Sequence, residues 1–208
     1  DSIDLMVVLD HHRMSLGVGT ENGLWYDDEY TVQSWIDGWE MLAARYADNT
    51  NVVGADVQNE PYLGTWGGGG DQDWAAAATD AGNAILAVNP NWLIFVEGVQ
   101  IYEGQNYWWG GNLEGVADLP IELDKANKIV YSPHDYPSSV SDQPWFNDPA
   151  YPANLPGVWD EYWGYIYREG IAPIWVGEFG TQLQTTSDEH WLNAITEYMD
   201  DNSSSGSS

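Results

Sequence analysis

The sequence predicts an α/β domain built around a parallel sheet, on two observations. Short apolar runs rich in Val and Ile alternate with longer segments whose apolar residues recur every three or four positions. The apolar runs do not alternate strictly with polar residues, which is typical of strands buried on both faces of a parallel sheet. A succession of strands and helices favours βαβ units with right-handed crossovers. The length of 208 residues is that of one domain with a sizeable core.

Five strands and four helices are expected. The strand runs lie at 4–10, 51–57, 92–98, 128–134 and 172–180. The helical segments lie at about 28–47, 72–88, 157–169 and 188–200, and Ser187 is the expected N-cap of the last one. Residues 99–127 lose the helical period and predict a long loop, which in compact domains is usually functional. The catalytic domain is expected over 1–200, followed by a disordered, Ser-rich tail or linker start at 201–208.

The composition excludes several classes of partner. Asp and Glu number 33 against 5 Lys and Arg, giving a formal net charge of −28. Such a field repels nucleic acid and anionic membranes, and no apolar run approaches the ~20 residues that span a bilayer. The absence of Cys excludes disulfides and a Cys nucleophile. The sequence begins without an initiator Met or a signal peptide, so we expect any secretion signal to be absent or already removed.

Aromatic residues are unusually distributed, with 13 Trp and 13 Tyr against 3 Phe. Trp and Tyr combine a flat apolar face with a polar group, which suits stacking on pyranose rings. About half of them are expected to serve the core instead.

Polar residues close every expected strand. They are Asp10, His11, His12, Arg13, Gln58, Asn59, Glu60, Glu97, His134, Asp135, Tyr136 and Glu178. In a parallel α/β barrel the carboxyl ends of the strands form the active-site face. An open doubly wound sheet would also bind ligands there, but no Gly-rich phosphate loop follows any strand, which argues against nucleotide binding.

Two of these carboxylates, Glu60 and Glu178, predict glycoside hydrolysis. That reaction needs one carboxyl group to protonate the leaving oxygen and a second to attack the anomeric carbon or activate water. A separation of ~5–5.5 Å gives retention of configuration and a wider one gives inversion.

The motifs Asn59-Glu60-Pro61, "HDY" at 134–136 and "WVGEFG" at 175–180 resemble glycoside hydrolase family 5. Longer stretches such as "NPNWLIFVEGVQ", "YWWGGNL" and "SPHDYPSSV" resemble the bacterial endo-β-1,4-glucanases of its first subfamily. The resemblance covers nearly all of 5–199 and implies a (β/α)8 barrel truncated to about strands 3–7. The first two strands, with an Arg on the second, and the last strand, with a substrate-stacking Trp, have no counterpart here.

The resemblance also implies roles for individual residues. Glu60 would be the general acid/base and Glu178 the nucleophile. Asn59 would hold the sugar 2-hydroxyl, and Tyr136 would orient Glu178. The other substrate-binding residues implied are His12, His134, Trp108 and Trp109. No metal or other cofactor is implied.

The leading interpretation is a secreted, retaining endo-β-1,4-glucanase acting on cellulose or soluble β-glucan, with a carbohydrate-binding module reached through the Ser-rich linker as a further expectation. The alternatives are a family-5 mannanase or mixed-linkage glucanase, and a glucan-binding fragment without catalysis.

Other polar residues have simpler expected roles. We expect Asp135 to be structural, His190 to lie on the surface and His11 to point away from the cleft. "DQD" at 71–73 is expected to cap a helix rather than bind a metal. Glu97 is expected either at the rim or as a partner of a site residue.

Overall fold

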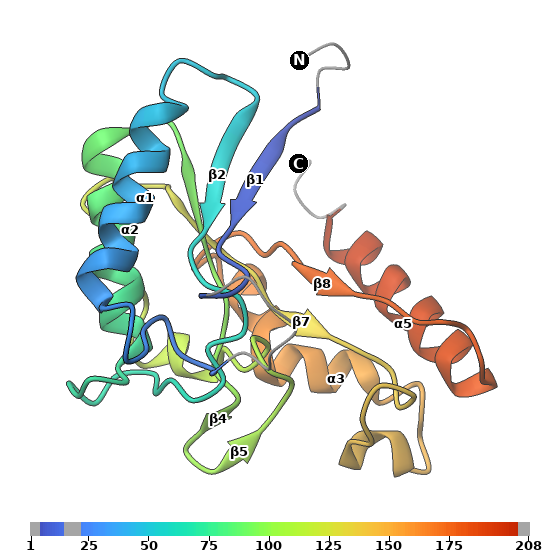
Figure 1. Cartoon of the computed structure of the whole chain (residues 1–208). Helices are drawn as coiled ribbons and strands as arrows, with labels where there is room; N and C mark the ends of the chain where they lie inside the picture. The colour runs from blue at the N-terminus through green and yellow to red at the C-terminus, as the bar shows by residue number, and fades with distance from the viewer. Residues whose placement is uncertain (1–4, 15–21, 204–208) are drawn as a thin grey trace.

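The computed structural model describes residues 5–14 and 22–203 and contains a curved parallel sheet (Figure 1). Its four main strands pair in the order β1-β2-β3-β6, and every pair is parallel. Their bounds are β1 Val7–Asp10, β2 Val52–Asp56, β3 Leu93–Val96 and β6 Ile129–Tyr131. Register is continuous from β2 to β6, since Ala55 lies beside Ile94 and Ile94 beside Ile129, whereas the β1–β2 pair has a register shift between Val7 and Val8.

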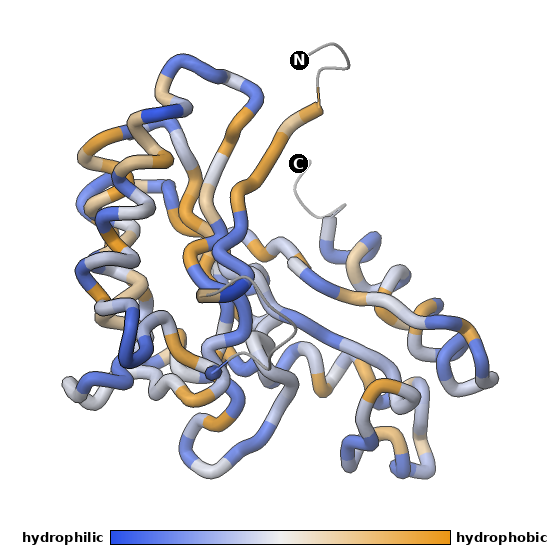
Figure 2. The backbone as a smooth tube through the Cα atoms, in the orientation of Figure 1, coloured by the Kyte–Doolittle hydropathy of each residue, from blue (hydrophilic) through white to orange (hydrophobic). Residues whose placement is uncertain are grey.

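A fifth strand position continues the arc. Tyr131 bridges to Ile174, and β7 (His134–Asp135) pairs in parallel with β8 (Glu178–Phe179). The five expected strands are therefore present in the expected order. Figure 2 shows the sheet strands as largely hydrophobic and the chain turning hydrophilic where several of them end.

Two helices cover the N-terminal part of the sheet and pack against each other: α1 (Val32–Arg45) and α2 (Trp74–Val88). Thr31 caps α1 by accepting a hydrogen bond from the Ser34 amide, and Asp73 caps α2 through the Ala76 amide. The capping role expected within "DQD" is thus confirmed for Asp73.

The C-terminal part carries α3 (Leu155–Trp159), a π-helical turn (Asp160–Gly164), α4 (Tyr165–Arg168) and α5 (Thr186–Ser203). Two short 3-10 helices lie at Glu114–Ala117 and Pro144–Asn147. The expected loop at 99–127 also holds a small hairpin of β4 (Ile101–Tyr102) and β5 (Gln105–Asn106).

The last helix corrects two expectations. Its N-cap is Thr185 rather than Ser187, because the Thr185 hydroxyl accepts a hydrogen bond from the Asp188 amide at 3.1 Å. The helix then continues to Ser203, three residues beyond the end expected at 200. Polar residues such as Asn202, whose side chain donates to the Tyr198 carbonyl, are compatible with a helix end. Residues 204–208, where the linker was expected, lie outside the described residues.

Most Trp side chains lie in the core. Trp25, Trp74, Trp92, Trp159 and Trp191 are at most 1% exposed. Trp25 packs on Trp74 with ring centroids 5.1 Å apart. Ten Trp and four Tyr side chains are buried, which is about half of the 26 Trp and Tyr residues taken together, as expected.

The two outer strands of the arc have free edges among the described residues. Here β1 pairs only with β2, and the strand around Ile174–Phe179 pairs only with β6 and β7. Large apolar side chains are exposed along these strands: Met6 at 74% and Trp175 at 59%. Trp175 lies beside Phe95 of β3, with ring centroids 6.4 Å apart. Within the described part of the chain, no helix has the length and apolar character to cross a bilayer.

Candidate active site

Glu60 follows β2 in a strained conformation. Its φ is +45°, in the left-handed region that non-Gly residues rarely occupy. The Glu60 amide donates a hydrogen bond to Glu97 Oε2 at 2.8 Å, and its carbonyl accepts one from the Tyr62 amide at 2.7 Å. These contacts hold the backbone so that the chain turns sharply after the strand.

Tryptophan indoles anchor the strand ends that carry the site. The Nε1 atoms of Trp35 and Trp39, both on α1, donate to the Val57 carbonyl at 3.0 Å. Trp74 on α2 donates in the same way to the Glu97 carbonyl at 2.8 Å. These bonds satisfy backbone oxygens that the ending sheet leaves unpaired, and they tie the rim to the helices.

Glu178 reaches the same rim from β8, where it is paired in register with His134. The Tyr136 hydroxyl donates a hydrogen bond to Glu178 Oε2 at 2.5 Å. Burial, this hydrogen bond and the charge of Glu178 raise the pKa of Tyr136 well above its usual value. Tyr136 therefore stays a neutral donor that fixes the orientation of the Glu178 carboxylate.

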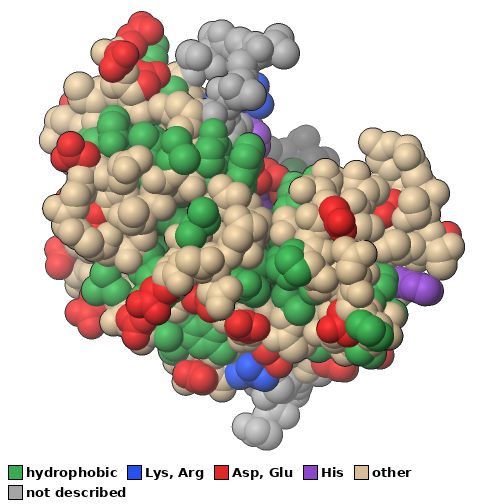
Figure 3. Space-filling model, turned by 90° about the horizontal axis from the view of Figure 1, so that it is seen from below, with side chains coloured by type: hydrophobic (Ala, Val, Ile, Leu, Met, Phe, Trp, Pro, Cys, Tyr) green, Lys and Arg blue, Asp and Glu red, His purple; other side chains and the backbone are tan. Residues whose placement is uncertain are grey.

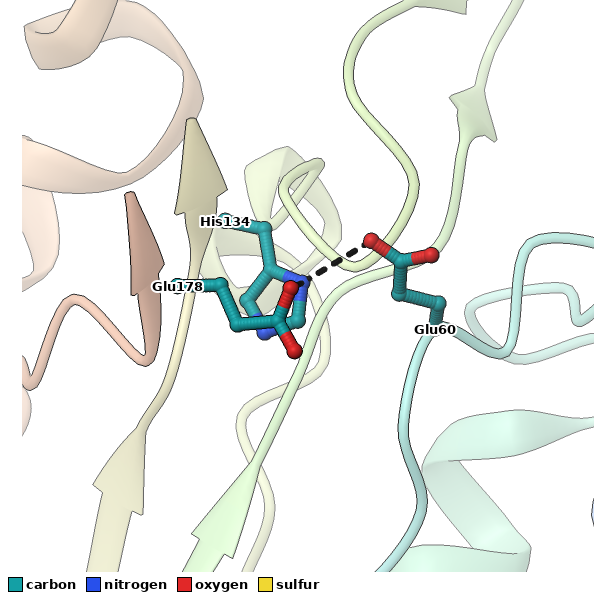
Figure 4. Close-up of side chains that lie close together, drawn as sticks. All are labelled: Glu60, His134 and Glu178. Atoms are coloured by element: carbon teal, nitrogen blue, oxygen red, sulfur yellow. Dashed lines mark hydrogen bonds and ion pairs between the residues drawn. The ribbon is translucent and has the colours of Figure 1, made fainter. Parts of the chain in front are cut away.

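His134 lies between the two carboxylates (Figure 4). Its Nδ1 atom is 3.0 Å from Glu60 Oε1 and 3.6 Å from Glu178 Oε2. One carboxylate oxygen of each Glu and this nitrogen all lie within 4.8 Å of one another. The side chains of Glu60 and Glu178 are 18% and 35% exposed, so the pair can be reached from solvent.

Carboxylates surround the buried His134. Burial alone would lower the pKa of His134, but the charge of Glu97 and the hydrogen bonds to Glu60 and Glu97 raise it well above its usual value. Among the described residues, Glu60, His134 and Glu178 form the one group whose ligand atoms lie close enough to share a cation.

The buried carboxyl group of Asp135 accepts hydrogen bonds that stabilise the strand end beside the site. Asp135 accepts hydrogen bonds from the Tyr107 hydroxyl and, at 2.6 Å, from Trp191 Nε1. Burial raises the pKa of Asp135 to about 7. These contacts join β7 to the long loop and to α5, which agrees with the structural role expected for Asp135.

A cleft of about 610 Å³ opens over the two carboxylates. Its lining residues are Glu60, Gln100, Tyr107, Trp108, Trp109, Tyr136, Val140, Ser141, Gln143 and Glu178. Figure 3 looks onto the side of the molecule toward which β1 and β2 run, and shows hydrophobic side chains across its middle with acidic ones around them. Apolar walls and a few convergent polar groups suit a ligand with both hydroxyl groups and flat apolar faces.

The two predicted Trp residues of the long loop differ in placement. Trp109 is 44% exposed and stacks on Tyr62, with ring centroids 4.0 Å apart and an interplanar angle of 17°. Trp108 is only 6% exposed and lies edge-on to Tyr136 at 5.9 Å. Trp109 thus presents a ring to the cleft on a supporting Tyr, whereas Trp108 forms part of the wall.

The structure brings some predicted residues closer to the pair than others. Asn59 is buried, and its backbone N–H donates a hydrogen bond to the His11 carbonyl at 3.1 Å. His12 does not line the cleft; it lies after β1, where its Nδ1 is 2.8 Å from Asp10 Oδ2. His11 bonds Gln58 at 2.8 Å and contacts Trp39, as expected of a residue directed away from the cleft. His190 is exposed on α5.

Two functional contacts went beyond the sequence reasoning. Glu97 was placed at the rim or beside a site residue, but its double contact with the Glu60 amide and with His134 was not foreseen. Its place at the end of an apolar run was the available signal. Tyr62 carried no signal, because its pairing with Trp109 joins a turn to a distant loop.

Two carboxylates at the carboxyl rim of a parallel α/β barrel arc, beneath an aromatic cleft, define a glycoside hydrolase type of site. The chain belongs to the family described as Cellulase (glycosyl hydrolase family 5), whose profile matches residues 1–206.

Relatives agree with this assignment. The chain is 52% identical over 202 residues to an endoglucanase of Paenibacillus polymyxa, a match covering 94% of this chain and 50% of that protein. It is 35% identical over 203 residues to the major extracellular endoglucanase of Xanthomonas campestris pv. campestris, covering 94% of this chain and 41% of the relative. The chain thus spans about half or less of the length of these relatives.

Solved structures share the fold. An endocellulase of Pyrococcus horikoshii in complex with cellotetraose superposes with a TM-score of 0.86 at 38% identity, covering 97% of this chain and 60% of that one. The catalytic domain of the Xanthomonas campestris enzyme gives a TM-score of 0.87 at 34% identity, covering 95% and 58%. The arc is therefore a truncated (β/α)8 barrel, as expected.

Proposed function

We propose that the protein acts as a retaining endo-β-1,4-glucanase, with Glu60 as general acid/base and Glu178 as nucleophile. The observation that carries this proposal is the approach of the two carboxyl groups, with one oxygen of each within 4.8 Å of the other. Such an approach favours the ~5–5.5 Å carboxyl spacing of retaining enzymes over the ~6.5–9.5 Å of inverting ones.

In the first step, a Glu178 oxygen attacks the anomeric carbon. The glycosidic C–O bond breaks, its electron pair stays on the leaving oxygen, and that oxygen takes the proton of Glu60. The product is a covalent glycosyl ester on Glu178.

In the second step, water attacks the anomeric carbon and gives a proton to the Glu60 carboxylate. The ester bond to Glu178 breaks, which restores both residues. Tyr136 supports the cycle by donating to Glu178 whenever it is ionised.

The surrounding residues support a glucan substrate. Trp109 presents a ring at the cleft, where a pyranose ring can stack. Asn59 precedes Glu60 and is assigned to the sugar 2-hydroxyl. His134 and Tyr136 complete the polar contacts around the cleavage point. Trp108 is assigned to the cleft wall. The substrate contact expected of His12 stays a prediction, because His12 lies outside the cleft lining.

Relatives point to the same substrate and location. A similar endocellulase is described in complex with cellotetraose, and a relative is named an extracellular endoglucanase. We accordingly assign β-glucan as the substrate and the cell exterior as the place of action. A carbohydrate-binding module beyond the described residues stays a prediction.

Hydrolysis assays separate this proposal from its alternatives. The 208-residue chain and a longer chain that supplies strands for both open edges are each tested on carboxymethyl-cellulose, mannan and mixed-linkage glucan. We expect the longer chain to cleave carboxymethyl-cellulose, and its Glu178→Gln variant to bind the polymer without cleaving it. Turnover of mannan alone would move the assignment to a mannanase. Binding without turnover in the unchanged longer chain would make the protein a glucan-binding module.

A further inference from the structure

Glu97 occupies an unusual position for a carboxylate. It directly follows β3 at 2% exposure, and burial raises its pKa to about 7. Its contacts do not involve the cleft, since Glu97 is absent from the cleft lining. A buried carboxylate is costly unless bonded, so the partners that hold it there indicate its role.

Both Glu97 oxygens contact groups that hold Glu60, the assigned acid/base. Oε2 accepts the hydrogen bond of the Glu60 amide at 2.8 Å, and Oε1 lies 3.3 Å from His134 Nε2. The other nitrogen of the same imidazole, Nδ1, lies 3.0 Å from Glu60 Oε1. One side chain thus reaches Glu60 twice, through its backbone and through the imidazole to its carboxyl group.

The hydrogen bond from the Glu60 amide to Glu97 stabilises a strained backbone. Glu60 has a φ of +45°, a conformation that persists only where neighbouring groups hold it. A hydrogen bond from its amide to a buried carboxylate is a strong way to do so, because charge-assisted bonds in a dry site are strong.

The imidazole contact has a different consequence. A His134 that is protonated at both nitrogens donates from Nε2 to Glu97 and from Nδ1 to Glu60 Oε1. Glu60 Oε1 is then occupied as an acceptor, so the proton that Glu60 transfers is carried by Oε2.

The long loop after β3 packs directly against Glu97 and His134. A Cβ atom at Gly110 would lie 2.4 Å from Glu97 Oε2 and 3.2 Å from His134 Nδ1, so only glycine allows the loop to lie this close. Gly110 also has a φ of +70°, which suits glycine.

We propose that Glu97 is a positioning residue for the acid/base Glu60, holding its strained backbone directly and its carboxyl group through His134. The inference rests on the proposed function, but its first test does not require activity.

The charged groups that face His134 are the carboxyl groups of Glu60, Glu97, Glu178 and, more deeply, Asp56. Only Glu97 contacts Nε2 among the ion pairs of the described residues. Removing the Glu97 charge by Glu97→Gln therefore changes one side of the imidazole, while the amide oxygen can still accept from the Glu60 N–H.

The test uses NMR of the 208-residue chain with isotope-labelled histidine, whose four His residues are assigned by single substitution. We expect His134 to titrate well above the usual range of histidine, and Glu97→Gln to lower the His134 midpoint by about one pH unit or more. Hydrogen exchange of the Glu60 amide should stay slow in Glu97→Gln and become fast in Glu97→Ala.

Asp73→Asn is the matched control. Asp73 is also a buried carboxylate that accepts backbone amides, from Gly67, Gly69 and Ala76. The Asp73→Asn variant should change the free energy of unfolding without moving the pH midpoint of the His134 titration. Equal shifts in the two variants, or no shift in Glu97→Gln, would overturn the proposal. If Glu97→Gln fails to fold, a His134 of the unchanged chain that titrates at or below the usual range of histidine overturns the proposal.

A second readout applies to a chain that hydrolyses glucan. Because Glu97 touches no substrate, Glu97→Gln should lower kcat by roughly 10- to 100-fold with little change in KM, and should displace the pH profile. A longer chain that is inactive, together with a His134 that still responds to Glu97→Gln, would refute the proposed function alone. An active enzyme whose His134 does not respond would refute the role of Glu97 alone.

Discussion

The Tyr136 hydroxyl donates a hydrogen bond to Glu178 Oε2 at 2.5 Å, which ties the assigned nucleophile to the strand beside it. Both residues lie at the ends of neighbouring strands, in which His134 pairs with Glu178. The position of the assigned nucleophile is therefore set by the register of the sheet as well as by its own side chain.

Tyr136→Phe removes this donor and little else, since the ring remains. A hydrogen bond to a charged group contributes about 1.5–3 kcal/mol, so we expect kcat in an active longer chain to fall roughly 10- to 150-fold. Tyr151→Phe is the control, because the Tyr151 hydroxyl bonds the Ser187 carbonyl away from the cleft. Steady-state kinetics on a soluble cello-oligosaccharide would show the difference, and equal effects of the two substitutions would contradict the assigned role.

Glu60→Gln should reveal an acid catalyst through the choice of leaving group. Loss of general acid catalysis costs about 10²- to 10⁴-fold on a glucan, whose leaving oxygen needs a proton. An aryl glycoside with an acidic phenol leaves without that help, so its glycosylation step should be much less affected. Pre-steady-state measurements on both substrates check this. A uniform loss would assign Glu60 to another role.

Trp109→Ala should weaken glucan binding by roughly tenfold, because stacking of a ring is worth on the order of 1 kcal/mol beyond its area. Tyr62→Leu should produce part of this loss, since Trp109 stacks on Tyr62 at 4.0 Å. Affinity electrophoresis in carboxymethyl-cellulose measures both. If Tyr62→Leu leaves binding unchanged, the support by Tyr62 is dispensable.

Asp135 predicts a pH-dependent stability. Burial raises the pKa of Asp135 from an ordinary value near 3.8 to about 7, so the folded state binds its proton more tightly than the unfolded state. The stabilisation is complete below about pH 3.8 and is lost as pH rises toward 7, with a slope of up to about 1.4 kcal/mol per pH unit. Urea unfolding of the chain and its Asp135→Asn variant between pH 4 and 8 tests this. Parallel pH curves for the two proteins would contradict it.

The free edges predict that some exposed side chains become buried in a longer chain. Trp175→Gln should change the stability of the 208-residue chain by less than about 1 kcal/mol, because Trp175 is 59% exposed. In a longer chain that closes the barrel it should cost about 3–5 kcal/mol. Ile101→Gln, at a position 53% exposed on the β4–β5 hairpin, should be mild in both. Equal effects of Trp175→Gln in the two chains would show that the arc does not close around this residue.

The sequence predicted the strand order and the site carboxylates because their signals are local. An apolar run followed by polar residues marks both a buried strand and its rim, and Glu60 and Glu178 each end such a run. Two glutamates at strand ends then require only the parallel topology to lie on one edge.

Contacts between residues far apart in the sequence were harder to predict from local sequence patterns. Trp35, Trp39 and Trp74 donate to carbonyl groups at the strand ends, which depends on how each helix crosses the sheet. The sequence therefore indicated that about half of the Trp and Tyr residues serve the core, but not which of them do. The contact of Glu97 with His134 depends in the same way on how the ends of two separate strands align in the sheet.

The anomeric form of the first product tests the central claim most directly. Hydrolysis of a cello-oligosaccharide by an active longer chain is followed by ¹H NMR before mutarotation proceeds. Double displacement through Glu178 predicts that the β-anomer appears first and the α-anomer only later. Initial release of the α-anomer would contradict the assignment of Glu178 as nucleophile.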